Sequence, residues 1–149
     1  MTVIAWDGKT LAGDRMCADT WTTRAVTKIR RARGGDALVG AAGDADRCRA
    51  LLAWFDRMDA AAPEPPFPSH LQTAGAADAT LLVVWRDGAV HLYQREPHPI
   101  ELQPGLHAIG SGAEAALAAM YCGKTSAEAV DVAAIFCRGV GLGVDELRF

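Results

Sequence analysis

The sequence predicts an α+β fold in which helices pack on antiparallel β-sheets. Two Asp-Gly pairs, Asp7-Gly8 and Asp87-Gly88, each join two short apolar runs, as in β-hairpins. The predicted helices are grouped between and after these hairpins rather than alternating with single strands, which argues against a parallel sheet. A chain of 149 residues fits a single domain, residues 1–149.

Three strand regions are expected in the first two thirds of the chain. Residues 3–6 and 10–13 form the first hairpin, and residues 80–85 and 89–93 form the second. Between them, residues 36–43 form an apolar run that ends in small residues, which predicts a buried strand.

A helix follows this buried strand. Its apolar residues recur at helical spacing, and either Asp44 or Asp46 can cap its first turn. The spaced apolar residues are Leu51, Leu52, Trp54, Phe55 and Met58. The segment 61–68 contains four prolines, so we expect a loop there.

The last third of the chain predicts two helices and a strand. The first helix covers residues 113–121 and ends at Gly123. The second begins at Ser126, which we expect to be its N-cap, and runs to about Cys137. Residues 143–149 are expected to form the final strand.

The composition excludes several classes of protein. The net charge of −3 does not favour nucleic acid or anionic membrane as a partner, and the small cluster of Arg30, Arg31 and Arg33 is interpreted as a solvated turn. No apolar run approaches the ~20 residues that span a bilayer, and no secretory leader is recognised, so a soluble cytoplasmic protein is expected.

The cysteines and histidines do not predict a metal or a cofactor. The four cysteines are widely spaced and form no CxxC pair, which favours reduced thiols over disulfides or zinc. The four histidines lack a ligand spacing such as HExxH. We therefore expect no metal site and no cofactor.

Thr2 is a candidate nucleophile. If Met1 is removed, which the small threonine side chain permits, the mature chain begins with a hydroxyl and a free α-amine on one residue. The hydroxyl oxygen can attack a carbonyl while the amine, with an unperturbed pKa near ~8, accepts its proton. The alternative is an ordinary Met-Thr start without catalytic meaning.

Four downstream residues decide between these alternatives. Asp14 ends the second predicted strand, Lys28 lies in Val-Thr-Lys-Ile, Gly43 ends the buried strand, and Ser111 lies in Gly-Ser-Gly. With Thr2, their order resembles the proteasome β-subunit family of N-terminal nucleophile hydrolases, especially bacterial and phage-borne members related to the heat-shock-locus peptidase. The resemblance covers nearly the whole chain and implies a four-layer αββα sandwich of the N-terminal nucleophile hydrolase type.

The resemblance also implies roles for these residues. Lys28 would lie near Thr2 and lower the pKa of its hydroxyl and amine, and Asp14 would orient Lys28. The backbone N–H of Gly43 would donate to the oxyanion, and Ser111 would hydrogen-bond near the α-amine and help to relay the proton. The implied substrate-binding residues are Cys17, Val26, Arg30, Ala41 and Ala45.

Each of these residues has a structural alternative. Asp14 can be a turn residue, Gly43 a packing glycine, and Ser111 a helix N-cap. Lys28 is one of three lysines in a chain rich in arginine, and lysine suits a site in which a pKa must be tuned. The family usually carries an acidic residue in the last helix, whereas residues 133–139 contain none and Asp131 lies one to two turns earlier.

The predicted function is a threonine-type peptidase. The resemblance implies two stacked rings of about six or seven subunits, a peptide or unfolded protein as substrate, and it leaves an ATP-driven unfoldase open as a partner. One alternative is a catalytically silent structural homologue, which the missing acidic residue favours. Another is an N-terminal nucleophile amidohydrolase that acts on a small amide.

Overall fold

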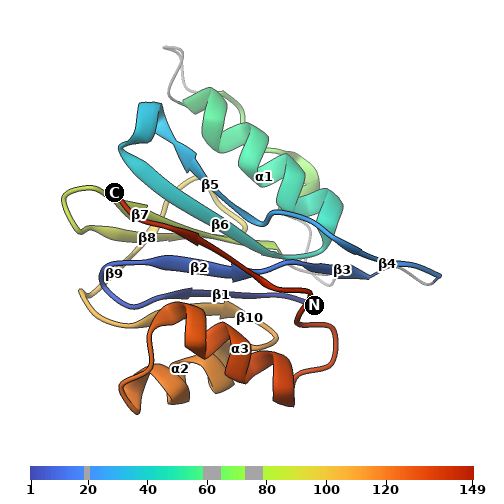
Figure 1. Cartoon of the computed structure of the whole chain (residues 1–149). Coiled ribbons are helices and arrows are strands. Elements are labelled where there is room, and N and C mark those ends of the chain that lie inside the picture. The colour runs from blue at the N-terminus through green and yellow to red at the C-terminus, as the bar shows by residue number, and fades with distance from the viewer. Residues whose placement is uncertain (19–20, 59–64, 73–78) are drawn as a thin grey trace.

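A computed structural model describes residues 1–18, 21–58, 65–72 and 79–149, which form three antiparallel sheets (Figure 1). The first sheet has the strand order β10-β1-β2-β11. Its strands are β1 (Val3–Trp6), β2 (Leu11–Asp14), β10 (His107–Gly110) and β11 (Val144–Leu147). The first predicted hairpin is present, and Gly8 adopts the positive φ of 92° that its turn requires.

The second sheet has the strand order β5-β6-β7-β8-β9. Its strands are β5 (Ile29–Ala32), β6 (Ala37–Gly43), β7 (Ala79–Trp85), β8 (Val90–Tyr93) and β9 (Ile100–Leu102). Strands β7 and β8 are the second predicted hairpin, and β6 is the predicted buried strand. Two short 3₁₀ helices, η1 (Arg33–Gly35) and η2 (Ser69–Leu71), lie in the connections.

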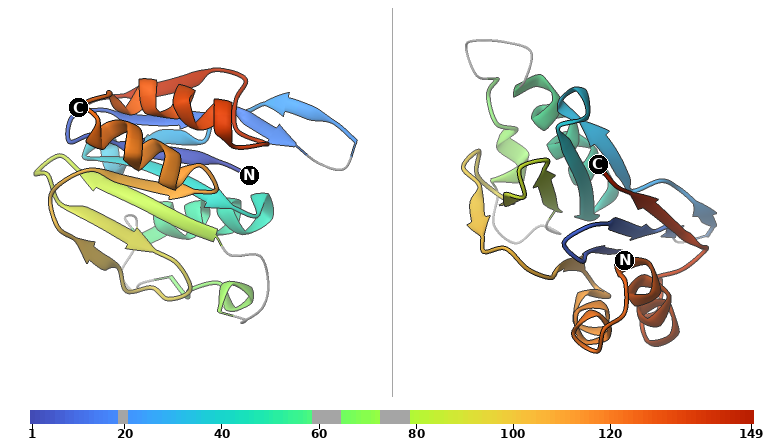
Figure 2. Two further views of the ribbon diagram at one scale, coloured as in Figure 1. Left: turned by 90° about the horizontal axis from the view of Figure 1, so that it is seen from below. Right: turned by 60° about the vertical axis from the view of Figure 1, so that its left-hand side comes forward.

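A two-stranded ribbon extends away from the two larger sheets (Figures 1 and 2). It consists of β3 (Met16–Ala18) and β4 (Thr23–Ala25), and the N–H of Val26 donates to the carbonyl of Arg15 at its base, at 2.7 Å. The sequence did not predict this ribbon because each of its strands has only three residues. It leaves the body immediately after Asp14 and returns just before Lys28, so its base adjoins the predicted site.

Helix α1 (Ala45–Met58) packs on strands β6 and β7. Its buried residues are Leu51, Trp54 and Phe55, which belong to one apolar cluster with the outer face of these strands. Asp44 caps the helix, because its Oδ1 accepts from the N–H groups of Asp46 and Arg47 at 3.1 and 3.0 Å. In the predicted loop 61–68, residues 65–68 are neither helix nor strand, and the rest lies outside the described residues.

Helices α2 (Ala113–Tyr121) and α3 (Ser126–Phe136) pack on strands β1 and β2 through small side chains such as Ala116 and Ala129. The N-cap of α3 is Thr125, not Ser126 as predicted, and Thr125 forms a capping box with Glu128. Ser126 is buried, and its N–H donates to Asp7 Oδ2 at 2.9 Å. This bond ties the start of α3 to the turn between β1 and β2.

A third apolar cluster joins the inner faces of the two larger sheets and includes Ile4, Ile29 and Leu82. Glycines permit the close approach of the sheets here. A Cβ atom on Gly40 would lie 2.6 Å from Ile4 Cγ2, and one on Gly13 would lie 2.9 Å from Ile29 Cγ2. Larger residues at these positions would force the sheets apart.

The structure contradicts the expected four-layer αββα sandwich. The described residues form eleven strands and three α-helices, so the protein is a small mixed domain dominated by antiparallel sheets. The single helix α1, about 10 Å wide, covers less than half of a five-stranded sheet whose strands lie about 4.8 Å apart. The ribbon of β3 and β4 belongs to neither larger sheet. Among the described residues, no helix is long and apolar enough to cross a bilayer.

Candidate active site

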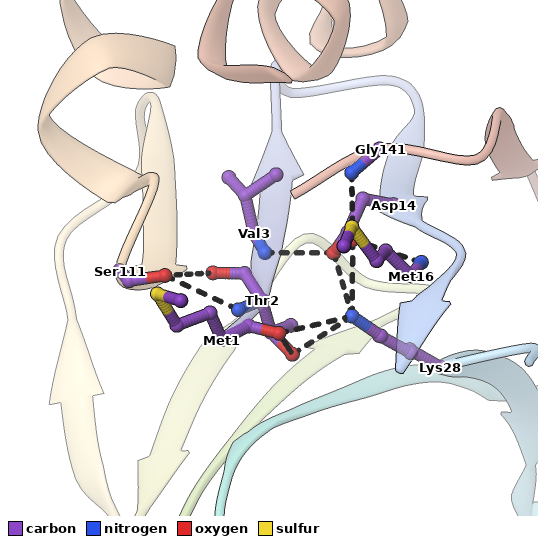
Figure 3. Close-up of polar contacts among 8 residues, drawn as sticks. All are labelled: Met1, Thr2, Val3, Asp14, Met16, Lys28, Ser111 and Gly141. Atoms are coloured by element: carbon purple, nitrogen blue, oxygen red, sulfur yellow. Dashed lines mark hydrogen bonds and ion pairs between the residues drawn. The ribbon is translucent and has the colours of Figure 1, made fainter. Parts of the chain in front are cut away.

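Four of the predicted catalytic residues meet at one end of the four-stranded sheet (Figure 3). Thr2 precedes β1, Asp14 ends β2, Lys28 precedes β5, and Ser111 follows β10. The antiparallel pairing of β1 with both β2 and β10 brings the start of β1 beside the ends of its two neighbours. Thr2 thus lies between Asp14 and Ser111, and its residue surface is only 6% exposed.

Asp14 is a fully buried carboxylate with a complete set of donors. Its Oδ1 accepts from the N–H of Val3 at 2.9 Å, and its Oδ2 accepts from the N–H groups of Met16 and Gly141 at 3.1 and 3.2 Å. These donors satisfy an acceptor-only group that would otherwise be costly to bury. They also fix the orientation of Asp14.

Lys28 connects Asp14 with Thr2. Its Nζ donates to Asp14 Oδ1 and Oδ2 at 2.9 and 3.0 Å and to Thr2 Oγ1 at 2.9 Å. The lysine side chain is 9% exposed, so water screens these contacts weakly. Its carbonyl accepts from the N–H of Ala41 at 3.3 Å, which ties the backbone of Lys28 to β6.

Ser111 and Gly110 position the backbone of Thr2. The N–H of Thr2 donates to Ser111 Oγ at 3.2 Å, and the Ser111 hydroxyl donates to the Thr2 carbonyl at 3.4 Å. Gly110 has φ of 95°, and a Cβ atom there would lie 2.2 Å from the Thr2 carbonyl oxygen. Only glycine allows this contact. The N-cap of α2 is Gly112, so the alternative role of Ser111 as that N-cap is wrong.

Met1 occupies the front of this cluster. Its carbonyl oxygen accepts from the Thr2 hydroxyl at 2.7 Å and from Lys28 Nζ at 3.3 Å. Its side chain lies against Gly139, where an added Cβ would be 2.6 Å from Met1 Cε. While Met1 is attached, the nitrogen of Thr2 is an amide and cannot act as a base.

A cleft of about 470 Å³ opens in front of Thr2. It is lined by Met1, Thr2, Ala42, Gly43, Asp44, Thr80, Gly110 and Ser111. The predicted oxyanion donor, Gly43, therefore lines the same cleft as the nucleophile, and it has φ of 129° at the end of β6. Asp14 and Lys28 are not among the lining residues. A separate hollow of about 300 Å³ beside the β8–β9 connection contains none of these residues.

The five predicted substrate-binding residues are absent from the lining of this cleft. Ala41 is buried in the apolar cluster beneath α1. Arg30 faces α1 from β5, where its guanidinium pairs with Asp56 at 2.6 Å and donates to the carbonyl of Leu52 at 3.3 Å. Arg30 is thus a strand residue in an ion pair rather than part of the predicted turn.

Cys17, Val26 and Ala45 do not line the cleft either. Cys17 is on β3, Val26 follows β4 at the base of the ribbon, and Ala45 is the exposed first residue of α1. Contact of these residues with a substrate stays a prediction.

Besides Met1, four lining residues were missed as site residues: Ala42, Asp44, Thr80 and Gly110. Asp44 was recognised only as a helix cap, although its place directly after Gly43 is a signal that it faces the same cleft. Thr80 lies opposite Ala42 in the β6–β7 pairing. No signal in the sequence indicates that register, because the two strands are separated by the whole of α1.

The charges near the cleft act on Cys48 in the first turns of α1. Burial and the neighbouring carboxylate of Asp44 raise the pKa of the Cys48 thiol to about 11, while Lys28 and the N-terminal ammonium act in the opposite direction. The fields of Asp44, Lys28 and the chain terminus therefore overlap at this end of α1.

The last helix adds no carboxylate to the cluster, because Asp131 is exposed on α3 and does not line the cleft. No group of three or more histidine, cysteine or acidic side chains is gathered as a metal site within the described ranges. No known family model matches the chain, and no curated protein matches it either.

Proposed function

We propose that this protein, once Met1 is removed, is a threonine-type peptidase that hydrolyses peptide bonds through an acyl-enzyme on Thr2. The observation that supports this most directly is the position of Lys28 Nζ, 2.9 Å from both Thr2 Oγ1 and Asp14 Oδ1. An ammonium group held against a hydroxyl oxygen stabilises negative charge on that oxygen. Such a contact suits a nucleophile better than a purely structural threonine.

Acylation begins with attack of Thr2 Oγ1 on the carbonyl carbon of the substrate. The hydroxyl proton passes to the free α-amine of Thr2. In the chain that still carries Met1, the nitrogen of Thr2 lies 3.2 Å from Ser111 Oγ. The N–H of Gly43 is proposed to stabilise the oxyanion from the other side of the cleft. The C–N bond then breaks, and the leaving amine takes the proton from the α-ammonium.

Deacylation uses the same groups. The α-amine accepts a proton from water, which attacks the ester carbonyl, and the ester C–O bond breaks as the proton returns to Thr2 Oγ1. The products are a carboxylic acid and an amine. No cofactor takes part in this sequence.

The test is covalent labelling with an epoxyketone, which requires the hydroxyl and the free amine of one residue. Intact mass should show loss of one methionine, and the mature protein should be labelled and should cleave peptides. Thr2→Ala should abolish both signals, whereas Thr2→Ser should retain part of the activity. Labelling that persists in Thr2→Ala contradicts the assignment.

We further propose that the subunits assemble into stacked rings, as the resemblance to proteasome β-subunits implies. Exposed large apolar side chains support an assembled state, since Trp21, Tyr121 and Phe136 are each at least 75% exposed. Light scattering after size-exclusion chromatography should report a particle many times the 15.8 kDa subunit mass. A monomer that is active on small amides would instead support the amidohydrolase alternative.

A catalytically silent homologue is the second candidate. The observation that favours it is the last helix, which adds no carboxylate to the cluster because Asp131 is exposed on α3 and does not line the cleft. If the purified protein retains Met1 and forms rings without hydrolysing peptides, this candidate replaces the peptidase.

A further inference from the structure

The cleft in front of Thr2 has an uneven distribution of charge. In the described part of the chain, Asp44 carries the one charged side chain among its lining residues, and the other seven are neutral and mostly small. Asp44 is exposed, and it lies where β6 ends and α1 begins, at the end of the cleft. An incoming substrate therefore meets a single carboxylate.

The position of this carboxylate is defined by the helix that it caps. Asp44 Oδ1 accepts from the N–H groups of Asp46 and Arg47, which restricts the side-chain rotamer. Its second oxygen, Oδ2, accepts no hydrogen bond from the residues that the structure describes, and no ion pair there involves Asp44. One oxygen is thus held in place while the other is available to a ligand.

Lys28 does not cancel the charge of Asp44. Lys28 donates to both oxygens of Asp14, and that pair is together neutral and lies behind Thr2. What remains at the cleft is the charge of Asp44 and, in the mature chain, an α-amine that must be unprotonated to act as a base. The cleft therefore attracts cations.

We infer that Asp44 selects substrates with a cationic nitrogen group close to the scissile carbonyl. This inference rests on the proposed function, because it treats the cleft as the substrate site. The cation can come from a lysine or arginine side chain within a peptide, or from the free α-amine at a peptide's N-terminus. An ammonium placed against an exposed carboxylate favours binding by up to about fivefold over a neutral group of the same shape.

A binding experiment tests the inference without turnover. The Thr2→Ala protein is titrated by NMR with acetyl-Ala-Ala-Lys-amide and with the same peptide carrying uncharged norleucine in place of lysine. We expect the lysyl peptide to bind about three- to fivefold more tightly, with a preference that weakens in 0.5 M salt. A third peptide, an uncapped norleucine amide, distinguishes recognition of an α-amine from recognition of a side chain.

Asp44→Asn is the decisive variant, because asparagine caps helices as well as aspartate does and the fold should persist. It should reduce the preference to less than about twofold. Asp46→Asn is the matched control, since it removes the same charge from the same helical turn but from a residue that does not line the cleft. Equal binding of the charged and neutral peptides, or an equal effect of the two variants, overturns the inference.

Turnover separates this inference from the proposed function. The mature wild-type protein is assayed with the corresponding aminocoumarin amides. If the lysyl peptide binds selectively but no amide is hydrolysed, the peptidase proposal fails and the role of Asp44 stands. If amides are hydrolysed at equal kcat/KM whatever their charge, the peptidase proposal stands and the selection by Asp44 is wrong.

Discussion

Replacing Lys28 with alanine should destabilise the fold as well as stop catalysis. Asp14 is fully buried, and Lys28 Nζ lies 2.9 and 3.0 Å from its two oxygens. Removing one partner of a buried ion pair costs about 3–5 kcal/mol, because the remaining charge is left without compensation. Three backbone N–H groups still donate to Asp14, so we expect a loss of about 2–4 kcal/mol.

Urea unfolding, followed by far-UV circular dichroism, measures this loss. With a slope of about 2 kcal/mol per molar urea, the midpoint should fall by about 1–2 M. The chain contains a matched control in Lys124, which precedes α3 and pairs with Glu128 of that helix at 3.1 Å, with both side chains about half exposed. Lys124→Ala should leave the midpoint almost unchanged, because exposed ion pairs contribute little.

Equal shifts for Lys28→Ala and Lys124→Ala would refute the argument that burial makes the Lys28 pair important. A large shift with normal peptidase activity in the remaining folded protein would refute the proposed action of Lys28 on Thr2. The two readouts therefore separate its structural role from its chemical one.

Two further predictions concern the frame of the site. Burial opposes ionisation of Asp7, but the backbone N–H groups that donate to it, first that of Ser126, lower its pKa overall. Asp7 should therefore stabilise the fold above about pH 4, and this contribution should fade as the pH falls through its lowered pKa, a dependence that Asp7→Asn should remove. Gly110→Ala should cost about 2 kcal/mol or more beyond Gly88→Ala, because both glycines have φ near 90° but only at Gly110 does the new Cβ meet Thr2.

Both predictions are checked by thermal unfolding. For Asp7, the wild type and Asp7→Asn are compared between pH 2 and 6, and parallel curves would contradict the linkage. For the glycines, each kcal/mol should lower the midpoint by about 2–4 °C, so Gly110→Ala should unfold several degrees below Gly88→Ala. Equal midpoints would mean that the backbone conformation alone, and not the contact with Thr2, determines the cost.

Local signals predicted most of the long elements. The Asp-Gly turns indicated both hairpins, and the spacing of Leu51, Trp54 and Phe55 indicated α1. Strands β3, β4, β5, β9 and β10 were not predicted, because runs of three or four residues carry little periodicity and no Asp-Gly turn marks these five. The sandwich architecture was wrong because it was inferred from a resemblance, and the resemblance did not indicate how much of each sheet the helices cover.

The candidate site shows the same division. The residue types and their order pointed to Thr2, Asp14, Lys28 and Ser111, and the hydrogen bonds place these four together. The implied pocket residues Arg30 and Ala41 were positioned by the resemblance alone, and the structure places one in an ion pair with Asp56 and the other in the core. Whether the cluster is catalytic stays a prediction.

The sequence by itself determined the chemistry that is available: a threonine hydroxyl directly after Met1, a lysine in a chain rich in arginine, and glycines at the turns. Only the tertiary structure decided which groups meet. Asp14 and Lys28 pair because the ribbon leaves and returns beside them, and Asp44 faces Thr2 because β6 ends next to the start of β1. These contacts join residues far apart in the chain, and they depend on strand register and sheet packing, which no local pattern encodes.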